Sequence, residues 1–224
     1  QPTVRIVVTG DELVPPGQPL LYGQIYESNG QMLQAALAQT GFTDVAVCTV
    51  PDDYLTTVTT LQLQLQAADV VVVSGGISVG DYDHVGKALL ALGVEEWFYK
   101  VRQKPGKPLF MGVKDHTVVF ALPGNPAAAL TCFYEYVLTA LRRAMGDTHF
   151  QLLHLQLPLS HDYRRKGGRA QFLKARCTGQ AVTLLDRQSS AMLQSFAHAN
   201  AIVYLPLEVT DLTEGDLVEV HLLP

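Results

Sequence analysis

Four consecutive valines occupy residues 70–73, and the glycine pair Gly75 and Gly76 follows one residue later. An unbroken apolar run predicts a strand that is buried on both faces, as in a parallel sheet, because a half-exposed strand would alternate apolar and polar positions. Glycines let backbone N–H groups approach a ligand closely, since no Cβ intervenes. The pattern therefore predicts a central strand whose carboxyl end leads into a ligand-binding loop.

Strand and helix patterns alternate along the first 146 residues. Strands are expected at residues 4–8, 44–50, 70–74, 95–101, 109–113 and 117–121, and helices at about 28–40, 54–67, 84–92 and 126–145. This alternation is typical of an α/β domain with a mostly parallel sheet and helices on both faces. After residue 147 short apolar runs alternate with turn residues, apart from one helical stretch at 189–199. We therefore predict an α/β domain over residues 1–147 and a small all-β domain over residues 148–224.

Composition and charge narrow the class of protein. The 224 residues are 48% hydrophobic with a formal net charge of −5, which argues against a broad nucleic-acid surface. No apolar run reaches the roughly 18 residues of a membrane span. Cys48, Cys132 and Cys177 are odd in number and far apart, which favours reduced thiols. These features predict a soluble, cytoplasmic protein, and a strand pattern that starts directly after Gln1 predicts a piece of a longer one.

Three of the expected strands lead into loops that contain acidic residues, and two of these loops also contain glycine. The loops contain Glu12, Asp52 and Asp83, and we expect them to meet because the carboxyl ends of parallel strands share one edge of a sheet. Each loop also has a structural interpretation. The first suits a plain turn, Asp52 and Asp53 suit the N-cap and first turn of the next helix, and Asp83 can cap the helix after it.

Two further segments are candidates for binding an anion. The basic segment 100–108 contains four cations; such a run is usually a solvated surface, but its Pro-Gly-Lys-Pro sequence favours lysines held in fixed positions. The turn at residues 122–126 places Asn125 as N-cap and Pro126 at the first helical position. Helix N-termini of this kind bind anions, and the same residues also suit a helix that is simply well capped.

The second domain offers fewer candidates. Arg169 lies in a basic glycine loop at residues 164–169, and Ser190 lies in a polar turn. Both stretches are surface loops by default. The seven histidines show no HExxH or other paired metal-ligand spacing, so we assign them no catalytic role.

Five strand-end motifs occur in one order along the chain: TGDEL at residues 9–13, PDD at 51–53, SGGISVG at 74–80 with Asp83, KPGKP at 104–108 and LPGNP at 122–126. In this combination they resemble the molybdopterin molybdenumtransferase family, which includes bacterial MoeA and the gephyrin E domain. The resemblance covers the whole chain, and the tail is similar to the family's C-terminal β domain. It implies a C-terminal portion that lacks the family's N-terminal domains, one of which arches over the active site of the partner subunit.

The resemblance also implies an activity. Members of this family insert molybdenum from molybdate into adenylylated molybdopterin, and AMP is released with assistance from Mg²⁺ or Zn²⁺. This chain would then serve molybdenum cofactor biosynthesis as a transferase, with a molybdopterin adenylyltransferase as pathway partner. A homodimer is implied for the full-length protein, and neither nucleic acid nor a membrane is expected as a partner.

Site residues are carried over from the resemblance by position. The implied catalytic residues are Glu12, Asp52, Asp83, Lys100 and Lys104, and the three acids are also the implied metal ligands. Hard oxygen ligands suit Mg²⁺, and a divalent ion can offset the charge of a pyrophosphate. The implied substrate-binding residues are Thr9, Gly75, Gly76, Ser78, Gly80, Asp81, Lys107, Pro123, Gly124, Asn125, Arg169 and Ser190. Asp81 stands where the family commonly has glutamate, which shortens the side chain by one methylene group.

Two other functions stay open. Molybdopterin adenylyltransferases share the glycine-loop domain, but they lack the appended β domain and their loop typically reads Gly-Gly-Thr-Gly. A non-catalytic binding or scaffold module, as in receptor clustering by gephyrin, is the other alternative. A scaffold does not need acidic loops and Lys104 to converge on one cleft, so these charges favour an enzyme.

Overall fold

Strand β5 (Val70–Ser74) lies in the middle of a six-stranded sheet, between β1 (Val4–Thr9) and β9 (Thr117–Leu122). The computed structural model describes residues 1–77, 84–165 and 167–224. All of β5 is buried, as the valine run predicts. Three further strands complete the order β4-β1-β5-β9-β8-β6: β4 (Val45–Val50), β8 (Phe110–Lys114) and β6 (Glu95–Tyr99).

The sheet is mostly parallel, as expected. β1 pairs in parallel with both β4 and β5, and β5 pairs in parallel with β9. β8 runs antiparallel to β9 and to β6, because a tight connection joins β8 directly to β9. Along the chain the strands first step from β1 to β4 and then cross to β5 on the other side of β1. The carboxyl ends of β1 and β5 therefore form the switch point at which open α/β sheets bind ligands.

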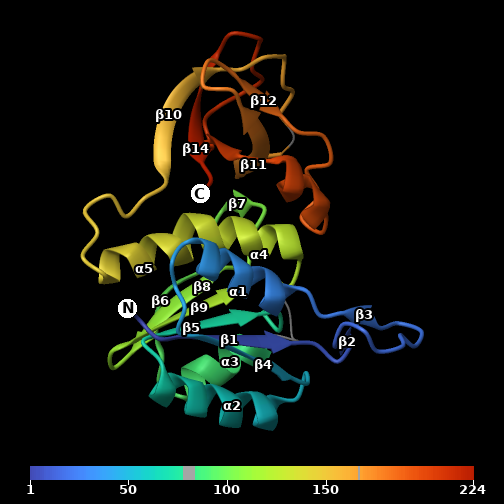
Figure 1. Ribbon diagram of the computed structural model, residues 1–224, viewed down its shortest axis with the longest axis vertical. Coiled ribbons are helices and arrows are strands. Elements are labelled where there is room, and N and C mark those ends of the chain that lie inside the picture. Colours follow the sequence, from blue (N-terminus) through green and yellow to red (C-terminus); the bar gives the residue numbers. More distant parts are fainter. Residues whose placement is uncertain (78–83, 166) are drawn as a thin grey trace.

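Helices cover both faces of this sheet (Figure 1). Three of them pack on one face: α1 (Asn29–Gln39), α4 (Pro126–Cys132) and α5 (Leu138–Ala144). Two pack on the other: α2 (Tyr54–Ala67) and α3 (His84–Ala91). Val70 and Val72 of β5 face the first core, and Val71 and Val73 face the second. In the described ranges, no helix is both long and apolar enough to cross a membrane.

The last helix of the α/β domain differs from the prediction. The sequence predicts one helix from residue 126 to about 145, but a π-helical segment, η1 (Phe133–Val137), separates α4 from α5. A π segment shifts the positions of the side chains around the helix and is common at functional sites. Here it contains Glu135 and Tyr136, whose side chains bond across to His221 and Gln103.

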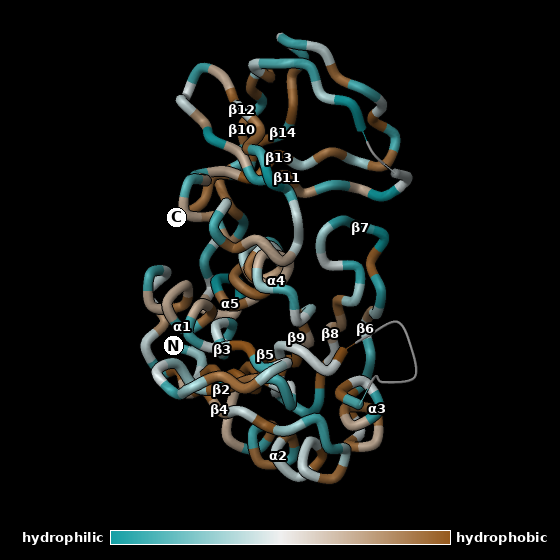
Figure 2. The backbone as a smooth tube through the Cα atoms, turned by 90° about the vertical axis from the view of Figure 1, so that its right-hand side faces the viewer, coloured by the Kyte–Doolittle hydropathy of each residue, from teal (hydrophilic) through white to brown (hydrophobic). Residues whose placement is uncertain are grey.

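The C-terminal domain is an antiparallel sheet in the order β10-β14-β13-β11-β12. Its strands are β10 (Leu153–Pro158), β14 (Leu217–Leu222), β13 (Ala201–Leu205), β11 (Ala170–Cys177) and β12 (Val182–Leu184). The helical stretch expected at 189–199 is a short 3₁₀ helix, η2 (Leu193–His198). Two views at right angles show this domain standing over α4 and α5 (Figure 1, Figure 2).

One strand of the basic segment joins the two domains. β7 (Gln103–Lys104) pairs in parallel with β11 of the C-terminal sheet. The stretch between β1 and α1 forms an arm in which β2 (Leu13–Val14) pairs in parallel with β3 (Ile25–Tyr26). This arm projects from the α/β domain (Figure 1).

Candidate functional site

A cavity of about 600 Å³ opens at the carboxyl ends of β1, β5 and β9. It lies at the switch point of the sheet, where a ligand site is expected. Of the residues named from the sequence, those that line it are Thr9, Glu12, Asp52, Gly75, Gly76, Pro123, Gly124 and Asn125. They come from four separate loops, so the fold brings together groups that are far apart in the sequence.

The glycine pair after β5 allows that strand to end directly against β1. Gly75 has φ +94° and Gly76 has φ +60°, which L side chains rarely adopt. A Cβ on Gly75 would lie 2.5 Å from the carbonyl oxygen of Thr9, and one on Gly76 would lie 2.6 Å from the Thr9 hydroxyl oxygen. Only glycine fits at either position, and the close approach shapes the floor of the cavity.

The sequence gives Asn29 a capping role only, but the structure places it at the cavity. It is buried and lines the cavity, and its Nδ2 donates to the Ser74 hydroxyl at 2.9 Å and to the Gly124 carbonyl at 2.7 Å. Ser28, not Asn29, is the N-cap of α1, and the Glu27 carboxylate accepts the Gly30 N–H at 2.7 Å. Asn29 therefore ties together the loops after β5 and β9, a role that a capping pattern cannot reveal.

Two buried polar atoms of the cavity wall have no partner among the described residues. They are the Thr9 hydroxyl oxygen and Asn29 Oδ1, on residues that are 5% and 7% exposed. A buried polar group without a hydrogen bond is costly and calls for a ligand or water. The wall therefore offers acceptors to a ligand that carries N–H or O–H groups.

The structure separates the two neighbouring acids after β4. Asp53 is the N-cap of α2, with its carboxylate accepting from the Thr56 N–H at 2.7 Å and the Thr56 hydroxyl at 2.6 Å. These two bonds lower the pKa of Asp53. Asp52 lines the cavity instead, and its N–H donates to Asp11 Oδ1 at 2.9 Å. The capping interpretation is thus correct for Asp53 and wrong for Asp52.

Part of the predicted site lies outside the described residues. This applies to Ser78, Gly80, Asp81 and Asp83. Their assignments stay predictions, and so does the metal site of three acids that includes Asp83. Within the described residues Glu12 and Asp52 are the members of that set that line the cavity.

A loop of the C-terminal domain closes one side of the cavity. Asn125 is the N-cap of α4, but its side chain makes no capping bond and instead donates to the Ser190 hydroxyl at 3.1 Å. The Ala128 N–H donates to the Ser190 carbonyl at 3.2 Å, so this first-turn N–H is already satisfied and does not await an anion. Ala191 then lines the cavity itself.

The predicted basic residues do not line the cavity. Lys104 lies in β7, directly after Gln103. Arg169 donates to the Gln103 carbonyl at 3.4 Å. These two cations therefore lie together at the junction of the domains. Lys100 lies over the ring of Tyr99, with Nζ 4.6 Å from the centroid. Lys107 is exposed. The segment reaches the cavity at Pro108.

We expect Asn29→Ala to lower the free energy of unfolding by about 1–3 kcal/mol, because the buried Ser74 hydroxyl loses the amide that donates to it. Urea unfolding measures this effect. Asn200→Ala is the matched control, since Asn200 also makes two hydrogen bonds, with Cys177, but at an exposed turn where water can replace them. Equal costs for the two substitutions would show that Asn29 has no special role.

Together, the open parallel sheet, its edge cavity and the appended antiparallel sheet define a ligand-binding α/β protein with a separate β domain. A family model described as a probable molybdopterin binding domain matches residues 5–143, and one described as the MoeA C-terminal region (domain IV) matches residues 156–223. The chain therefore belongs to the molybdopterin-binding domain family and continues into the MoeA C-terminal region. The predicted boundary at 147/148 falls between the two matches and stays a prediction.

Named relatives agree with this family. The chain is 35% identical to molybdopterin molybdenumtransferase 2 of Mycobacterium tuberculosis, over 97% of this chain and 55% of that protein. It is 33% identical to the Drosophila melanogaster molybdenum cofactor synthesis protein cinnamon, over 94% of this chain and 36% of that protein. A crystal structure of a MoeA protein from Pyrococcus horikosii matches with a TM-score of 0.84 at 33% identity, over 99% of this chain and 54% of that one. The chain spans about half the length of the molybdenumtransferases it matches.

Proposed function

We propose that the protein containing this chain transfers molybdenum from molybdate to adenylylated molybdopterin and releases AMP. The observation that carries the proposal is the cavity at the switch point, where four loops supply carboxylates, glycine turns and polar side chains around one space. Family membership indicates a pterin ligand for that space. The relative from Mycobacterium tuberculosis is named for the same transfer.

The C-terminal domain favours this step over adenylylation. Residues 156–223 match the MoeA C-terminal region. The molybdopterin adenylyltransferases, which share the glycine-loop domain, lack an appended β domain. This domain also contributes to the cavity, through Ala191 and through the contact of Ser190 with Asn125. A transferase that uses both domains explains why they meet at the cavity.

The acids of the cavity suit Mg²⁺. Glu12 and Asp52 offer carboxylate oxygens at exposed positions, which are the ligands that Mg²⁺ prefers. Neither histidine nor cysteine occurs among the described residues that line the cavity, and these are the side chains that favour Zn²⁺. When bound, Mg²⁺ would offset the charge of the pyrophosphate. In this proposal Glu12 and Asp52 hold the ion, with Asp83 as a third ligand.

The cations at the domain junction suit the oxyanion substrate. Lys104 and Arg169 lie on paired strands or next to them, and fixed cations bind tetrahedral oxyanions such as molybdate. Lys100 and Lys107 are exposed on the same segment and would add positive charge. The glycine turn at Gly75 and the unpartnered atoms of the wall are then left for the pterin ligand.

The arm between β2 and β3 supports a homodimer. Three large apolar side chains of the arm are exposed: Leu21 by 72%, Tyr22 by 107% and Ile25 by 54%. Contact between such side chains and water is unfavourable, so a partner that covers them stabilises the arm. Ile25 and Tyr26 also line the cavity, so a second copy bound to the arm would lie next to the site. We infer a cytoplasmic enzyme that takes its adenylylated substrate from a molybdopterin adenylyltransferase.

Calorimetric titration of this chain with adenylylated molybdopterin tests the proposal. We expect binding that strengthens when Mg²⁺ and molybdate are present, because Mg²⁺ held by the carboxylates of the cavity would offset the charge of the pyrophosphate. Unadenylylated molybdopterin is the control and should lose the dependence on Mg²⁺. The same titration of the full-length protein completes the design, since the relatives are about twice as long. An absence of binding to both proteins would favour the scaffold function.

A further inference from the structure

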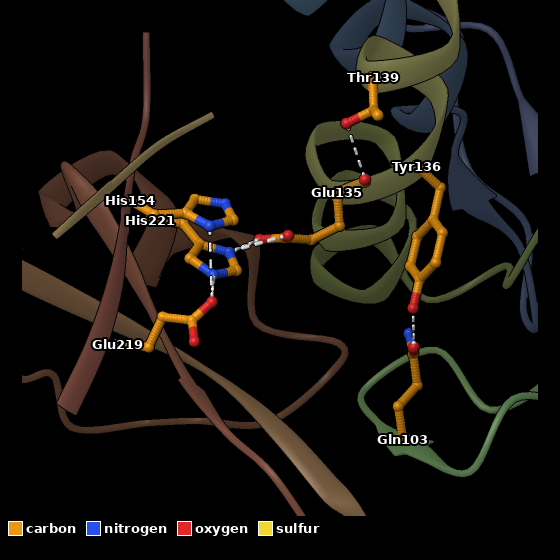
Figure 3. A network of polar contacts seen from close by, with 7 residues as sticks. All are labelled: Gln103, Glu135, Tyr136, Thr139, His154, Glu219 and His221. Carbon is orange, nitrogen blue, oxygen red and sulfur yellow. Dashed lines mark hydrogen bonds and ion pairs between the residues drawn. The ribbon is translucent and has the colours of Figure 1, made fainter. Parts of the chain in front are cut away.

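A buried histidine of the C-terminal domain has a carboxylate at each of its ring nitrogens, and one of the two carboxylates comes from the α/β domain (Figure 3). His221, in β14, is 4% exposed. Its Nδ1 lies 2.9 Å from Glu135 Oε2, in the π segment of the α/β domain, and its Nε2 lies 2.9 Å from Glu219 Oε1 in its own strand. The pair of Glu135 and His221 is therefore an ion pair across the domain interface.

The geometry defines the charge of this ring. A neutral imidazole carries one N–H and can donate to one acceptor, whereas the imidazolium donates from both nitrogens. Because both neighbours of His221 are carboxylates at hydrogen-bond distance, only the doubly protonated ring satisfies both contacts. Burial alone would lower the pKa of His221, but the bonds and charges of Glu135 and Glu219 outweigh it and the pKa is raised.

A second histidine lies flat on the first. The rings of His154, in β10, and His221 are 3.8 Å apart and 8° from parallel, because the two residues are directly opposite in the antiparallel pairing of β10 and β14. Burial and the neighbouring His221 charge lower the pKa of His154. The stack therefore consists of one charged ring and one neutral ring.

His154, Glu219 and His221 also place three ligand-type atoms within 4.8 Å of one another. However, a histidine binds a metal along its ring plane, and two parallel rings separated by 3.8 Å cannot both aim a nitrogen at one ion. Glu135 and Glu219 also already occupy both nitrogens of His221. The arrangement is that of a protonated histidine held between two carboxylates.

We propose that protonated His221 is a positioning residue, a clasp that holds the C-terminal domain against the π segment and thereby keeps the Ser190 loop on the cavity. β14 pairs with β13, and β13 follows η2 and the Ser190 loop along the chain. When the bond between His221 and Glu135 breaks, the C-terminal domain is held less firmly against the π segment, and so is the loop that contains Ser190. The bonds of Ser190 to Asn125 and to the Ala128 N–H are then weakened.

The clasp operates within a window of pH. The groups that face His221 are Glu135 from η1, Glu219 from β14, His154 from β10, and the rings of Tyr204 from β13 and Phe172 from β11. Since the pKa of His221 is raised above about 6.5, its contribution is complete below that value and is lost as the pH rises through the raised pKa. His154 gains a proton only below about 6.5, and it then places a second cation against the first.

Amide hydrogen exchange of the intact chain across pH tests the clasp without any substrate. The readout is the protection factor of the Ala128 N–H, which reports on the bond to Ser190. We expect a maximum at intermediate pH, with a decline on both sides. In His221→Gln the protection should fall about tenfold, the equivalent of one charge-assisted hydrogen bond, and its alkaline decline should disappear.

Three variants sharpen this test. Glu135→Gln removes the partner charge and should match His221→Gln, with little further loss when the two are combined; it also serves if His221→Gln fails to fold. His154→Gln should abolish the acidic decline and keep the alkaline one. His161→Gln, in the same domain with its ring beside Ser160, is the matched control and should change nothing.

Nitrogen-15 NMR of the imidazole rings gives an independent result. We expect two protons on the His221 ring and one on the His154 ring at pH 7. A singly protonated His221, or unchanged Ala128 protection in His221→Gln and Glu135→Gln, overturns the proposal. A pH dependence that EDTA abolishes and Zn²⁺ restores would also overturn it, in favour of a metal site. None of these outcomes depends on the proposed enzymatic function.

Discussion

Asp52→Asn in the full-length protein is expected to slow AMP release by about 100- to 1,000-fold, the usual cost of removing one group that stabilises charge at a reacting centre. Binding of adenylylated molybdopterin should weaken much less, because the walls of the cavity stay in place. The reason is structural: Asp52 lines the cavity while Asp53 beside it serves the helix. Single-turnover measurement of AMP release and a parallel binding titration separate the two effects.

The neighbouring acid supplies a matched control. Asp53→Asn removes the same charge one residue away but keeps a good N-cap, so both AMP release and the melting temperature should change little. Asp53→Ala should lower the melting temperature by removing the bonds to Thr56, again with AMP release unchanged. If Asp52→Asn and Asp53→Asn slow the reaction equally, the general charge of the loop matters and Asp52 has no specific role.

Gly75→Ala is expected to lower the free energy of unfolding by about 2–5 kcal/mol. About 1–2 kcal/mol comes from a side chain in a left-handed conformation, since φ at Gly75 is +94°. A further 1–3 kcal/mol or so comes from overpacking, because the new Cβ would lie 2.5 Å from the Thr9 carbonyl oxygen. Urea unfolding measures the total. The displaced end of β1 should also weaken ligand binding in the cavity.

Gly179→Ala isolates the conformational part of this cost, and the difference between the two substitutions gives the overpacking part. Gly179 has nearly the same φ, +89°, but apart from its chain neighbours no atom of the described residues lies within 4 Å of the position that its Cβ would take. It should therefore cost only the conformational part, about 1–2 kcal/mol, and leave ligand binding unchanged. Equal losses for the two glycines would mean that β1 and β5 can separate without cost, and that the close approach does not shape the cavity.

The local sequence pattern predicts some of the structural features correctly and leaves others undetermined. The valine run at 70–73 predicts a strand buried on both faces, and β5 is that strand. Capping rules correctly place Asp53 at the start of α2. The same rules leave Asp52 ambiguous and give no site role to Asn29, because both residues act on loops that are distant in the sequence.

The histidines illustrate the same limit. His154 and His221 are 36% and 5% exposed as side chains, and nothing in their spacing links them. They meet because β10 and β14 pair in antiparallel register. Glu135 reaches His221 from a π segment that lies in what the sequence predicts as an ordinary helix.

The sequence by itself determined the elements and the fold class: alternating strands and helices, the glycine turn, the β domain and the motifs of the family. Those features depend on local physics, namely the burial period of a strand or helix and the backbone freedom of glycine. The tertiary structure alone decided that Asn29 joins two loops and that His221 connects the domains. These depend on register and on packing between segments far apart along the chain, and short-range patterns do not encode such distances.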